Sequence, residues 1–393
     1  MGVSILVTGG TGFLGSLIVT ALHEKHPDWH ITILDLQPPP SQQTPNLNIN
    51  YVEGDVTKAQ DILQTVQSIA PTVIVHTAGL VPPLRNRFSR TLEARVLDIN
   101  VNGTANMLAA ARQTRSVTAF VWTGSCTAVI DNFRHSYRNI DESYPTSAQD
   151  SLIYGESKAK AEKLVLAAND FDDDGDADVG GEQLATCALR LSVLFGPGDY
   201  QLIPSVHACI AKFETPFVIG NGTNLWDVSY APNMADAHVL AVENLLSPTK
   251  TAAGEAIFIQ NNEPIPFRDF CLEVWKNFGH YPPFEVRLPE GLAWLAGWVA
   301  ELGTWAVGTP YTLSTGSVMD ACAVRYASGE KARRLLGYEP RVGIEEGIRL
   351  SCAEYAQRLK ANELEKQNSK EKEQLRRDRT QEDLSWRLWR FLE

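Results

Sequence analysis

Three polar residues in the first half of the chain are candidates for moving a proton to or from a substrate. Tyr154 and Lys158 stand four residues apart in a strongly helical stretch, so their side chains share one helix face. A phenol is a poor base at neutral pH, but a neighbouring ammonium ion favours the phenolate and lowers its pKa. Ser125 directly follows an apolar segment about thirty residues upstream, roughly one strand–helix unit away. Its hydroxyl could orient a substrate oxygen, and the alternative role is to cap a helix.

A glycine-rich segment precedes these residues, between an apolar strand at 4–8 and a helical pattern at 16–26. Gly9, Gly12 and Gly15 form a G-x-x-G-x-x-G turn, which lets the backbone approach a pyrophosphate at the N-terminus of a helix. Asp35 ends the next strand about twenty residues later, the spacing expected of a carboxylate that binds a ribose 2′-hydroxyl. No basic residue follows it directly, which favours NAD over NADP. A glycine turn that only packs a helix on a sheet is the alternative.

The elements that must position these residues alternate along the chain. Further strands are predicted at 30–34, 51–56, 72–76, 119–122 and 186–191, with helical segments between them. This alternation predicts an α/β fold, a Rossmann-type doubly wound parallel sheet that binds ligands at the carboxyl ends of its strands. Asp55 is expected either to cap a helix or to bind adenine. The predicted cofactor contacts are Gly9, Thr11, Gly12, Phe13, Leu14, Gly15, Asp35, Asp55, Val56, Ala78, Tyr154 and Lys158.

Composition narrows the class of protein. The chain has 393 residues and a formal net charge of −12, which argues against a nucleic-acid partner. Its six cysteines are scattered without paired spacing, as expected of reduced intracellular thiols rather than disulfides or a zinc site. No secretory signal or myristoylation pattern precedes the first strand. An acidic insertion at 169–183 lacks the glutamate of a calcium loop, and we expect a flexible surface loop.

Longer segments resemble one family. The glycine turn, Asp35, Ser125 and the Tyr154/Lys158 pair are similar to those of the extended short-chain dehydrogenases/reductases. Residues 3–355 further resemble the 3β-hydroxysteroid dehydrogenases, and among them the sterol-4α-carboxylate 3-dehydrogenases, in the same order along the chain. The segments that carry this resemblance are 189–199, 227–238, 254–267 and 335–340.

The resemblance implies a role for each candidate. Tyr154 would be the general base and acid, Lys158 would tune it and bind the nicotinamide ribose, and Ser125 would orient the hydroxyl. Asn100 matches the structural asparagine of the family, and a helix-terminal amide is its alternative role. The chain departs from the family pattern at Gly124, at 231–232 and in the acidic insertion. None of these departures removes a catalytic group.

The predicted organisation is an NAD-binding domain at 1–195, a smaller C-terminal α/β substrate domain at 196–355 from which some segments return to the first sheet, and a charged helical tail at 356–393. Residues 288–307 are apolar, with tryptophans at helical spacing and too few uncharged residues to span a membrane. They predict either a core helix or an apolar lid that contacts the substrate or a membrane interface. The end of the tail, 384–392, predicts a membrane-surface contact or packing on protein.

These observations predict NAD-dependent oxidation of the 3β-hydroxyl of a sterol or related terpenoid, with loss of a 4α-carboxylate as CO2 where the substrate carries one. A nucleotide-sugar epimerase or dehydratase is the main alternative, and a non-catalytic NAD-binding regulator is the other. The expected location is the cytoplasmic side of the endoplasmic reticulum membrane, as a peripheral protein, or the cytoplasm. The sequence leaves homodimer formation open.

Overall fold

The computed structural model describes residues 2–38, 48–130, 135–147, 151–171, 183–307 and 313–390. Side chains at 85, 304–307 and 369–390 are outside this description. The central residues of the acidic insertion, 172–182, also lie outside it, so the prediction for that loop is not addressed.

A seven-stranded sheet forms the centre of the molecule, and every neighbouring pair of its strands is parallel. The strand order is β12-β7-β5-β4-β1-β2-β3. The strands are β1 Ser4–Thr8, β2 His30–Asp35, β3 Ile49–Glu53, β4 Val73–His76, β5 Ala119–Ser125, β7 Ala185–Leu191 and β12 Glu255–Ile259. Because the order reverses at β1 and β4, the carboxyl ends of these two strands border the crevice in which this type of sheet binds ligands.

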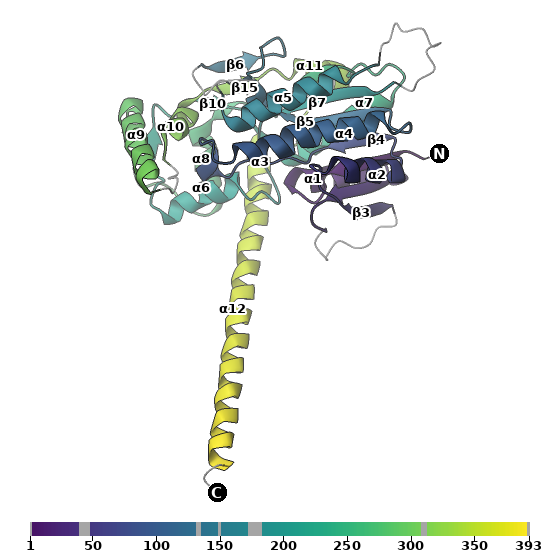
Figure 1. The fold of residues 1–393 in the computed structure, drawn as a ribbon. Coiled ribbons are helices and arrows are strands. Elements are labelled where there is room, and N and C mark those ends of the chain that lie inside the picture. The colour runs from purple at the N-terminus through teal and green to yellow at the C-terminus, as the bar shows by residue number, and fades with distance from the viewer. Residues whose placement is uncertain are drawn as a thin grey trace.

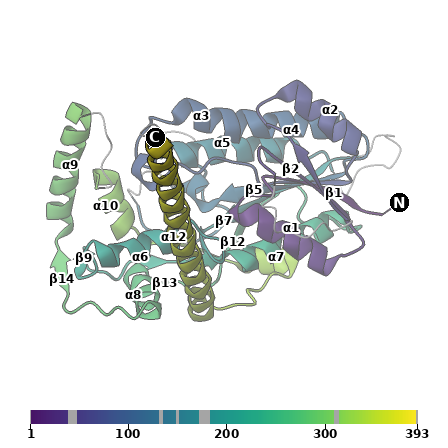
Figure 2. The same ribbon diagram turned by 90° about the horizontal axis from the view of Figure 1, so that it is seen from below.

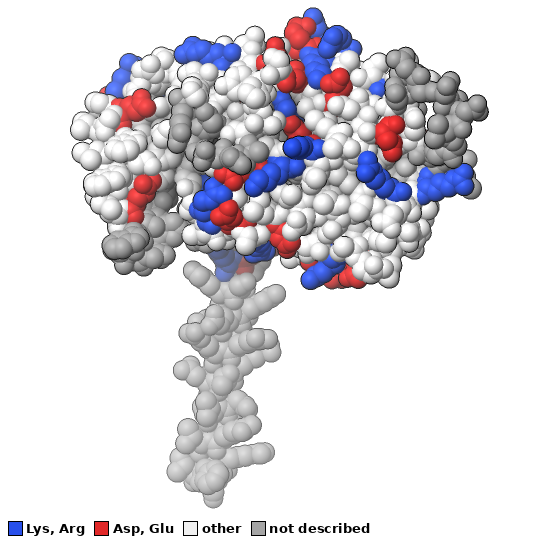
Figure 3. All heavy atoms as spheres, turned by 45° about the horizontal axis from the view of Figure 1, so that its top comes forward, with Lys and Arg blue, Asp and Glu red and all other residues white. Residues whose placement is uncertain are grey.

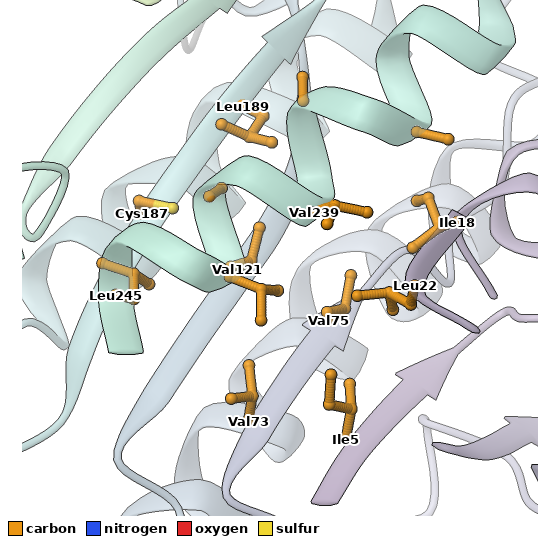
Figure 4. Packing of buried hydrophobic residues seen from close by; sticks show 14 of the residues in the cluster. Ile5, Ile18, Leu22, Val73, Val75, Val121, Cys187, Leu189, Val239 and Leu245 are labelled. Atoms are coloured by element: carbon orange, nitrogen blue, oxygen red, sulfur yellow. The ribbon is translucent and has the colours of Figure 1, made fainter. Parts of the chain in front are cut away.

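Helices cover both faces of the sheet, as Figure 2 shows. One layer contains α2 Ala59–Ile69, α3 Glu93–Leu97, α4 Gly103–Arg112 and α5 Ile153–Ala167. The other contains α1 Phe13–Lys25 and α7 Ala231–Leu246. Figure 4 shows α7 lying over β4, β5 and β7, with Val121, Leu189 and Val239 in the buried cluster between them. The central strands β4, β5 and β7 are buried along their whole length and mostly apolar, because helices cover them on both sides.

The second half of the chain builds smaller sheets beside this layer structure (Figure 1). The short strands are β6 Tyr137–Ile140, β8 Val193–Phe195, β9 Phe217–Ile219, β10 Leu225–Trp226, β11 Val228–Tyr230, β13 Ile265–Pro266, β14 Val286–Leu288 and β15 Arg325–Ala327. The remaining helices are α6 Leu202–Ala211, α8 Phe267–Asn277, α9 Glu290–Val307, α10 Thr315–Cys322, α11 Glu330–Leu336 and α12 Ile344–Arg390.

Two of these helices bear on the predictions. Helix α9 is not a core helix, because most of its apolar side chains, among them Trp294 and Trp298, are exposed. The predicted tail is part of α12, which begins at Ile344, packs its first turns on the second half of the molecule and then projects away from the body (Figure 1). The side chains of 384–392 lie outside the described part. Within the described ranges, no helix combines the length and the apolar character needed to cross a lipid bilayer.

Candidate active site

The glycine turn is packed so closely that only glycine fits at two of its positions. Gly9 has a φ of +70°, and a Cβ atom there would lie 2.9 Å from the backbone of Ala78. A Cβ atom on Gly15 would lie 2.0 Å from the carbonyl oxygen of Gly9. Gly12 caps α1 without a side chain. The first backbone N–H groups of α1 therefore remain accessible to an anionic group at the positive end of the helix.

Asp35 stands at the end of β2 and is tied to this turn. Its Oδ2 atom accepts hydrogen bonds from the backbone N–H of Thr11, at 3.0 Å, and from the Thr11 hydroxyl, at 2.6 Å. Its Oδ1 atom accepts a hydrogen bond from the backbone N–H of Leu36 at 2.7 Å. A carboxylate has about four acceptor positions, so it can also bind a ribose hydroxyl. The turn and this carboxylate fit an NAD molecule.

Asp55 closes a turn instead of capping a helix. Its Oδ1 atom accepts hydrogen bonds from the backbone N–H and the hydroxyl of Thr57, and the cap of α2 is Lys58. Val56 is buried, in contact with the backbone of α4 at Gly103.

Phe13 and Leu14 begin α1 and point in different directions. The Phe13 ring meets the Tyr200 ring edge-on, with their centroids 6.3 Å apart. Leu14 packs against the main core. Phe13 therefore lies on the side of the turn that faces the loop before α6.

Ser125 and Tyr154 are brought together at the carboxyl end of β5. The Ser125 hydroxyl caps the 3-10 turn Cys126–Val129, accepting hydrogen bonds from the backbone N–H of Thr127 at 3.2 Å and from its hydroxyl at 2.9 Å. It also lies close enough to the Tyr154 phenol to favour the phenolate. The structure thus confirms the capping role of Ser125. The capping bonds use its lone pairs and leave its own proton to donate, so the predicted role in orienting a substrate oxygen stays compatible with the cap.

Lys158 lies beneath this pair, almost fully buried on α5. Its Nζ atom donates a hydrogen bond to the carbonyl oxygen of Thr123 at 2.8 Å and lies 4.8 Å from the centre of the Trp122 ring. The same atom is 5.8 Å from the centre of the Tyr154 ring. Burial lowers the pKa of Lys158 to about 8, because a charged ammonium ion loses its hydration there.

The pKa of Tyr154 does not follow the direction expected from its spacing to Lys158. Burial raises it above its usual value, and the Cys126 thiol adds to that effect. The neighbouring Ser125 hydroxyl and the positive charge of Arg87 act in the opposite direction and lower the pKa. Desolvation of the phenolate dominates here because the Lys158 ammonium group is held by a backbone carbonyl and is not bonded to the phenol.

Asn100 connects the loop after β4 to helix α5 from within a π-helical turn, Asp98–Asn102. Its Oδ1 atom accepts a hydrogen bond from the backbone N–H of Leu80 at 2.7 Å. Its Nδ2 group donates to the Leu80 carbonyl and to the hydroxyl of Ser157, the neighbour of Lys158 on α5. A Cβ atom on Gly79 would lie 3.3 Å from Asn100 Oδ1 and 3.6 Å from Lys158 Nζ. Asn100 therefore holds the segment after β4 against the catalytic helix.

Sequence reasoning missed two features of the site. The Thr123 hydroxyl is hydrogen-bonded at 2.9 Å to Nε2 of His238, a buried residue of α7, so the strand end that receives Lys158 is fixed from the opposite face of the sheet. Arg87 follows β4 in the chain and is close enough to Tyr154 to affect its pKa. No local pattern reveals either feature, because each depends on residues far apart in the chain.

The two described departures from the family pattern have steric explanations. A Cβ atom on Gly124 would lie 2.9 Å from both the Leu189 carbonyl oxygen and the Trp122 ring, so glycine is required there. Ala231 and Pro232 form the first turn of α7, where the missing N–H of proline costs nothing.

Comparison with known proteins identifies the family. The model of the 3-beta hydroxysteroid dehydrogenase/isomerase family matches residues 6–290. The chain belongs to this family. It is 36% identical to a decarboxylating sterol-4-alpha-carboxylate 3-dehydrogenase of Schizosaccharomyces pombe, over 89% of the chain and 96% of that protein. It is 30% identical to isoform 1 of the 3beta-hydroxysteroid-dehydrogenase/decarboxylase of Arabidopsis thaliana, over 88% of the chain and 77% of that protein.

Solved structures share the fold at lower identity. One is a UDP-glucose 4-epimerase of Thermotoga maritima, with a TM-score of 0.65, 19% identity, and coverage of 91% of this chain and 99% of that one. This likeness confirms the predicted fold class and carries no function. The family membership confirms the resemblance stated from the sequence.

Proposed function

We propose that the protein catalyses NAD-dependent oxidation of a 3β-hydroxyl group on a sterol or related terpenoid that carries a 4α-carboxylate, followed by loss of that carboxylate as CO2. The observation that carries the proposal is the enclosure of Ser125, Tyr154 and Lys158 together at the carboxyl end of β5, beside the glycine turn. The names of the relatives supply the substrate class. NAD, when bound, supplies an acceptor for the hydride from the carbinol carbon.

Each candidate residue would have its own role in the oxidation. Tyr154, as the phenolate, would accept the hydroxyl proton, and Ser125 would hold the same oxygen by donating its own proton. Before the substrate binds, the neighbouring Ser125 hydroxyl and the charge of Arg87 favour the phenolate against burial. The Lys158 ammonium group, held by the Thr123 carbonyl, would bind ribose hydroxyls from beneath.

Loss of CO2 from the oxidised substrate needs little further catalysis. Oxidation at carbon 3 makes the 4α-carboxylate part of a β-keto acid. The bond between carbon 4 and the carboxyl carbon then breaks, and its electron pair passes through carbon 3 to the ketone oxygen as an enolate. Tyr154, now protonated, is placed to donate a hydrogen bond to that oxygen, where charge develops.

The test is to follow absorbance at 340 nm with NAD and a panel of 3β-hydroxy sterols, with and without a 4α-carboxylate, and to measure released CO2. We expect reduction of NAD with the sterols and CO2 only from the carboxylated ones. Turnover of UDP-sugars without turnover of sterols would overturn the proposal in favour of a nucleotide-sugar enzyme. Asp35→Ala should reduce the preference for NAD over NADP, and an unchanged preference would contradict the assigned role of that carboxylate.

We further propose that α9 makes a peripheral contact with the cytoplasmic face of the endoplasmic reticulum membrane. The support is its exposed apolar surface: Leu292, Trp294, Leu295, Trp298, Val299 and Leu302. In Figure 3, acidic and basic side chains are interspersed over most of the visible face, and the end of the molecule that carries α9 is largely uncharged. Tryptophan and leucine on one helix are suited to a lipid interface, where a sterol is also found.

Flotation of the full chain with phosphatidylcholine vesicles tests this contact. The double variant Leu295→Ser/Val299→Ser removes two neighbouring side chains one turn apart, and we expect it to lose most of the vesicle-bound fraction. Leu364→Ser, an equally exposed leucine on α12, is the matched control and should leave binding unchanged. Equal binding by the double variant and the unmodified protein would contradict the proposal.

A further inference from the structure

The segment that follows β4 packs against the start of α5 through two residues, Phe88 and Arg90. Phe88 packs in an apolar cluster with Cys126 and Leu152, the neighbours of Ser125 and of the start of α5. A Cβ atom on Gly316 would lie 2.7 Å from the Phe88 ring, so the first turn of α10 covers this side chain closely. Arg90 makes a bidentate ion pair with Glu156 on α5, at 2.9 and 3.0 Å. The segment that contains Arg87 is therefore held near the start of α5.

Arg87 lies next to Phe88 in the chain, and its partner is neutral. Its Nη2 atom donates a hydrogen bond at 2.9 Å to Oε1 of Gln201, just before α6. Within the part of the chain that the structure describes, its guanidinium group has no carboxylate within ion-pair distance. The other arginines around the site are paired: Arg90 with Glu156, Arg190 with Glu162, and Arg325 with Asp320.

An unpaired guanidinium group in a partly dehydrated position favours a bound anion. The group stays charged at neutral pH, so burial cannot neutralise it. A single bond to a neutral amide does not offset the loss of hydration, whereas a carboxylate can accept two parallel hydrogen bonds from the guanidinium fork. Asp320 lies near enough to act on Arg87 electrostatically, but its carboxylate is bonded to Arg325 at 2.7 Å.

The position of Arg87 relative to Tyr154 matches the proposed substrate. In a 3β-hydroxy-4α-carboxylate the anionic group is attached to the carbon next to the one that bears the hydroxyl. An enzyme that holds the hydroxyl at Tyr154 must therefore place the carboxylate a few ångströms away. Arg87 is placed on this side of the site by its neighbours. Phe88, the next residue, packs in the cluster that contains Cys126 and Leu152, beside Ser125 and the start of α5. Gln201, the hydrogen-bond partner of Arg87, follows Tyr200, whose ring meets that of Phe13 at the glycine turn. The charge of Arg87 also acts on the Tyr154 phenol.

We propose that Arg87 binds the carboxylate of the substrate and that Gln201 releases it to do so. The inference rests on the proposed function and adds the residue that would distinguish carboxylated sterols from neutral ones. Arg87 would thus determine specificity, while Tyr154, Ser125 and Lys158 carry out the oxidation of either substrate.

The experiment compares two substrates that differ only at carbon 4: a 3β-hydroxy sterol with a 4α-carboxylate and the same sterol with a 4α-methyl group. Steady-state rates with NAD are measured for the unmodified chain, Arg87→Gln, Arg87→Lys and the control Arg333→Gln. Arg333 is an exposed arginine on α11 that pairs with Glu330. Thermal melting of each variant verifies its folding.

We expect Arg87→Gln to lower the ratio of kcat/KM for the acid to kcat/KM for the methyl sterol by at least about 30-fold, chiefly through a higher KM for the acid. Arg87→Lys should recover part of the ratio, because a charge without the fork remains. Arg333→Gln should leave it unchanged.

Three results would overturn the inference. An equal loss with both sterols would mean that Arg87 only positions the site. A higher KM for NAD with an unchanged substrate ratio would assign Arg87 to the cofactor. If the unmodified protein reduces NAD with neither sterol, the proposed function itself is wrong. This outcome is distinguishable from one in which the protein oxidises both sterols and its substrate ratio does not depend on Arg87.

Discussion

The carboxyl end of β5 and the surface of α9 both contain tryptophan beside small residues. The tryptophan of β5 is buried, whereas those of α9 are exposed to water. Trp122 is 1% exposed and lies under the Lys158 ammonium group. Trp294 and Trp298 on α9 are 44% and 45% exposed. At the first site Lys158 is held by a hydrogen bond to the carbonyl oxygen of Thr123, and Ser125 by hydrogen bonds from Thr127. At the second, apolar surface is left in contact with water, which suits contact with a membrane or an apolar molecule.

The largest effect should come from removing one oxygen atom at the fixed site. Tyr154→Phe eliminates the proposed proton acceptor, and general acid–base catalysis contributes about 10²–10⁴ in rate. We expect kcat with a sterol substrate to fall by about that factor while the melting temperature stays within a few degrees. NAD reduction at 340 nm and thermal unfolding measure the two quantities. Full turnover by this variant would exclude the mechanism for any substrate.

A matched pair of tryptophan substitutions compares the packing of the two regions directly. Trp122→Ala removes a buried ring and should lower the free energy of unfolding by about 3–5 kcal/mol. Trp298→Ala removes a ring that water already reaches, and we expect a loss of about 1 kcal/mol or less. Denaturant unfolding of both variants gives the comparison. Similar losses would show that α9 is buried in solution and would remove the basis of the membrane proposal.

The contrast also explains what the sequence could predict. Six strands of the central sheet and the glycine turn follow from local patterns, because an apolar run or a tight turn constrains its own neighbours. That Ser125 and Tyr154 lie on one side of the sheet follows from the alternation of strands and helices, which brings the carboxyl ends of parallel strands to one edge. The links from Thr123 to His238 and from Arg87 to Gln201 span more than a hundred residues, and no local pattern encodes them. The exposure of α9 could not be predicted either, since an apolar helix has the same spacing whether or not another element covers it.

Lys158 offers a test in which function and stability should move in opposite directions. Its pKa is lowered to about 8 by burial, so the folded state binds this proton less tightly than the unfolded chain does. Below pH 8 Lys158 is charged in both the folded and the unfolded state, so the full free-energy cost of burying the charge lowers stability. From about pH 8 to 10.5 the unfolded chain binds more protons than the folded one, so stability rises with pH and this cost is relieved.

Lys158→Met should therefore lose most activity and gain about 1–3 kcal/mol in free energy of unfolding at neutral pH, after allowance for the lost bond to the Thr123 carbonyl. The gain over the unmodified protein should shrink between pH 8 and pH 10. Urea unfolding at several pH values measures it. If the stability gained by the variant stays constant or grows with pH, the charge of Lys158 is not what destabilises the unmodified protein.

The smallest effect is expected on α9 and depends on which side of the helix is changed. A Cβ atom on Gly297 would lie 2.7 Å from the backbone of Ser314, whereas nothing lies within 4 Å of one on Gly291. Gly291→Ala should thus raise the free energy of unfolding by at most about 0.5 kcal/mol, the gain from helix propensity near a helix end. Gly297→Ala, which must push α10 away, should lower it by about 1–3 kcal/mol. Urea unfolding of the two variants decides whether α9 is anchored along one face only, because a helix packed on both faces would be destabilised by either alanine.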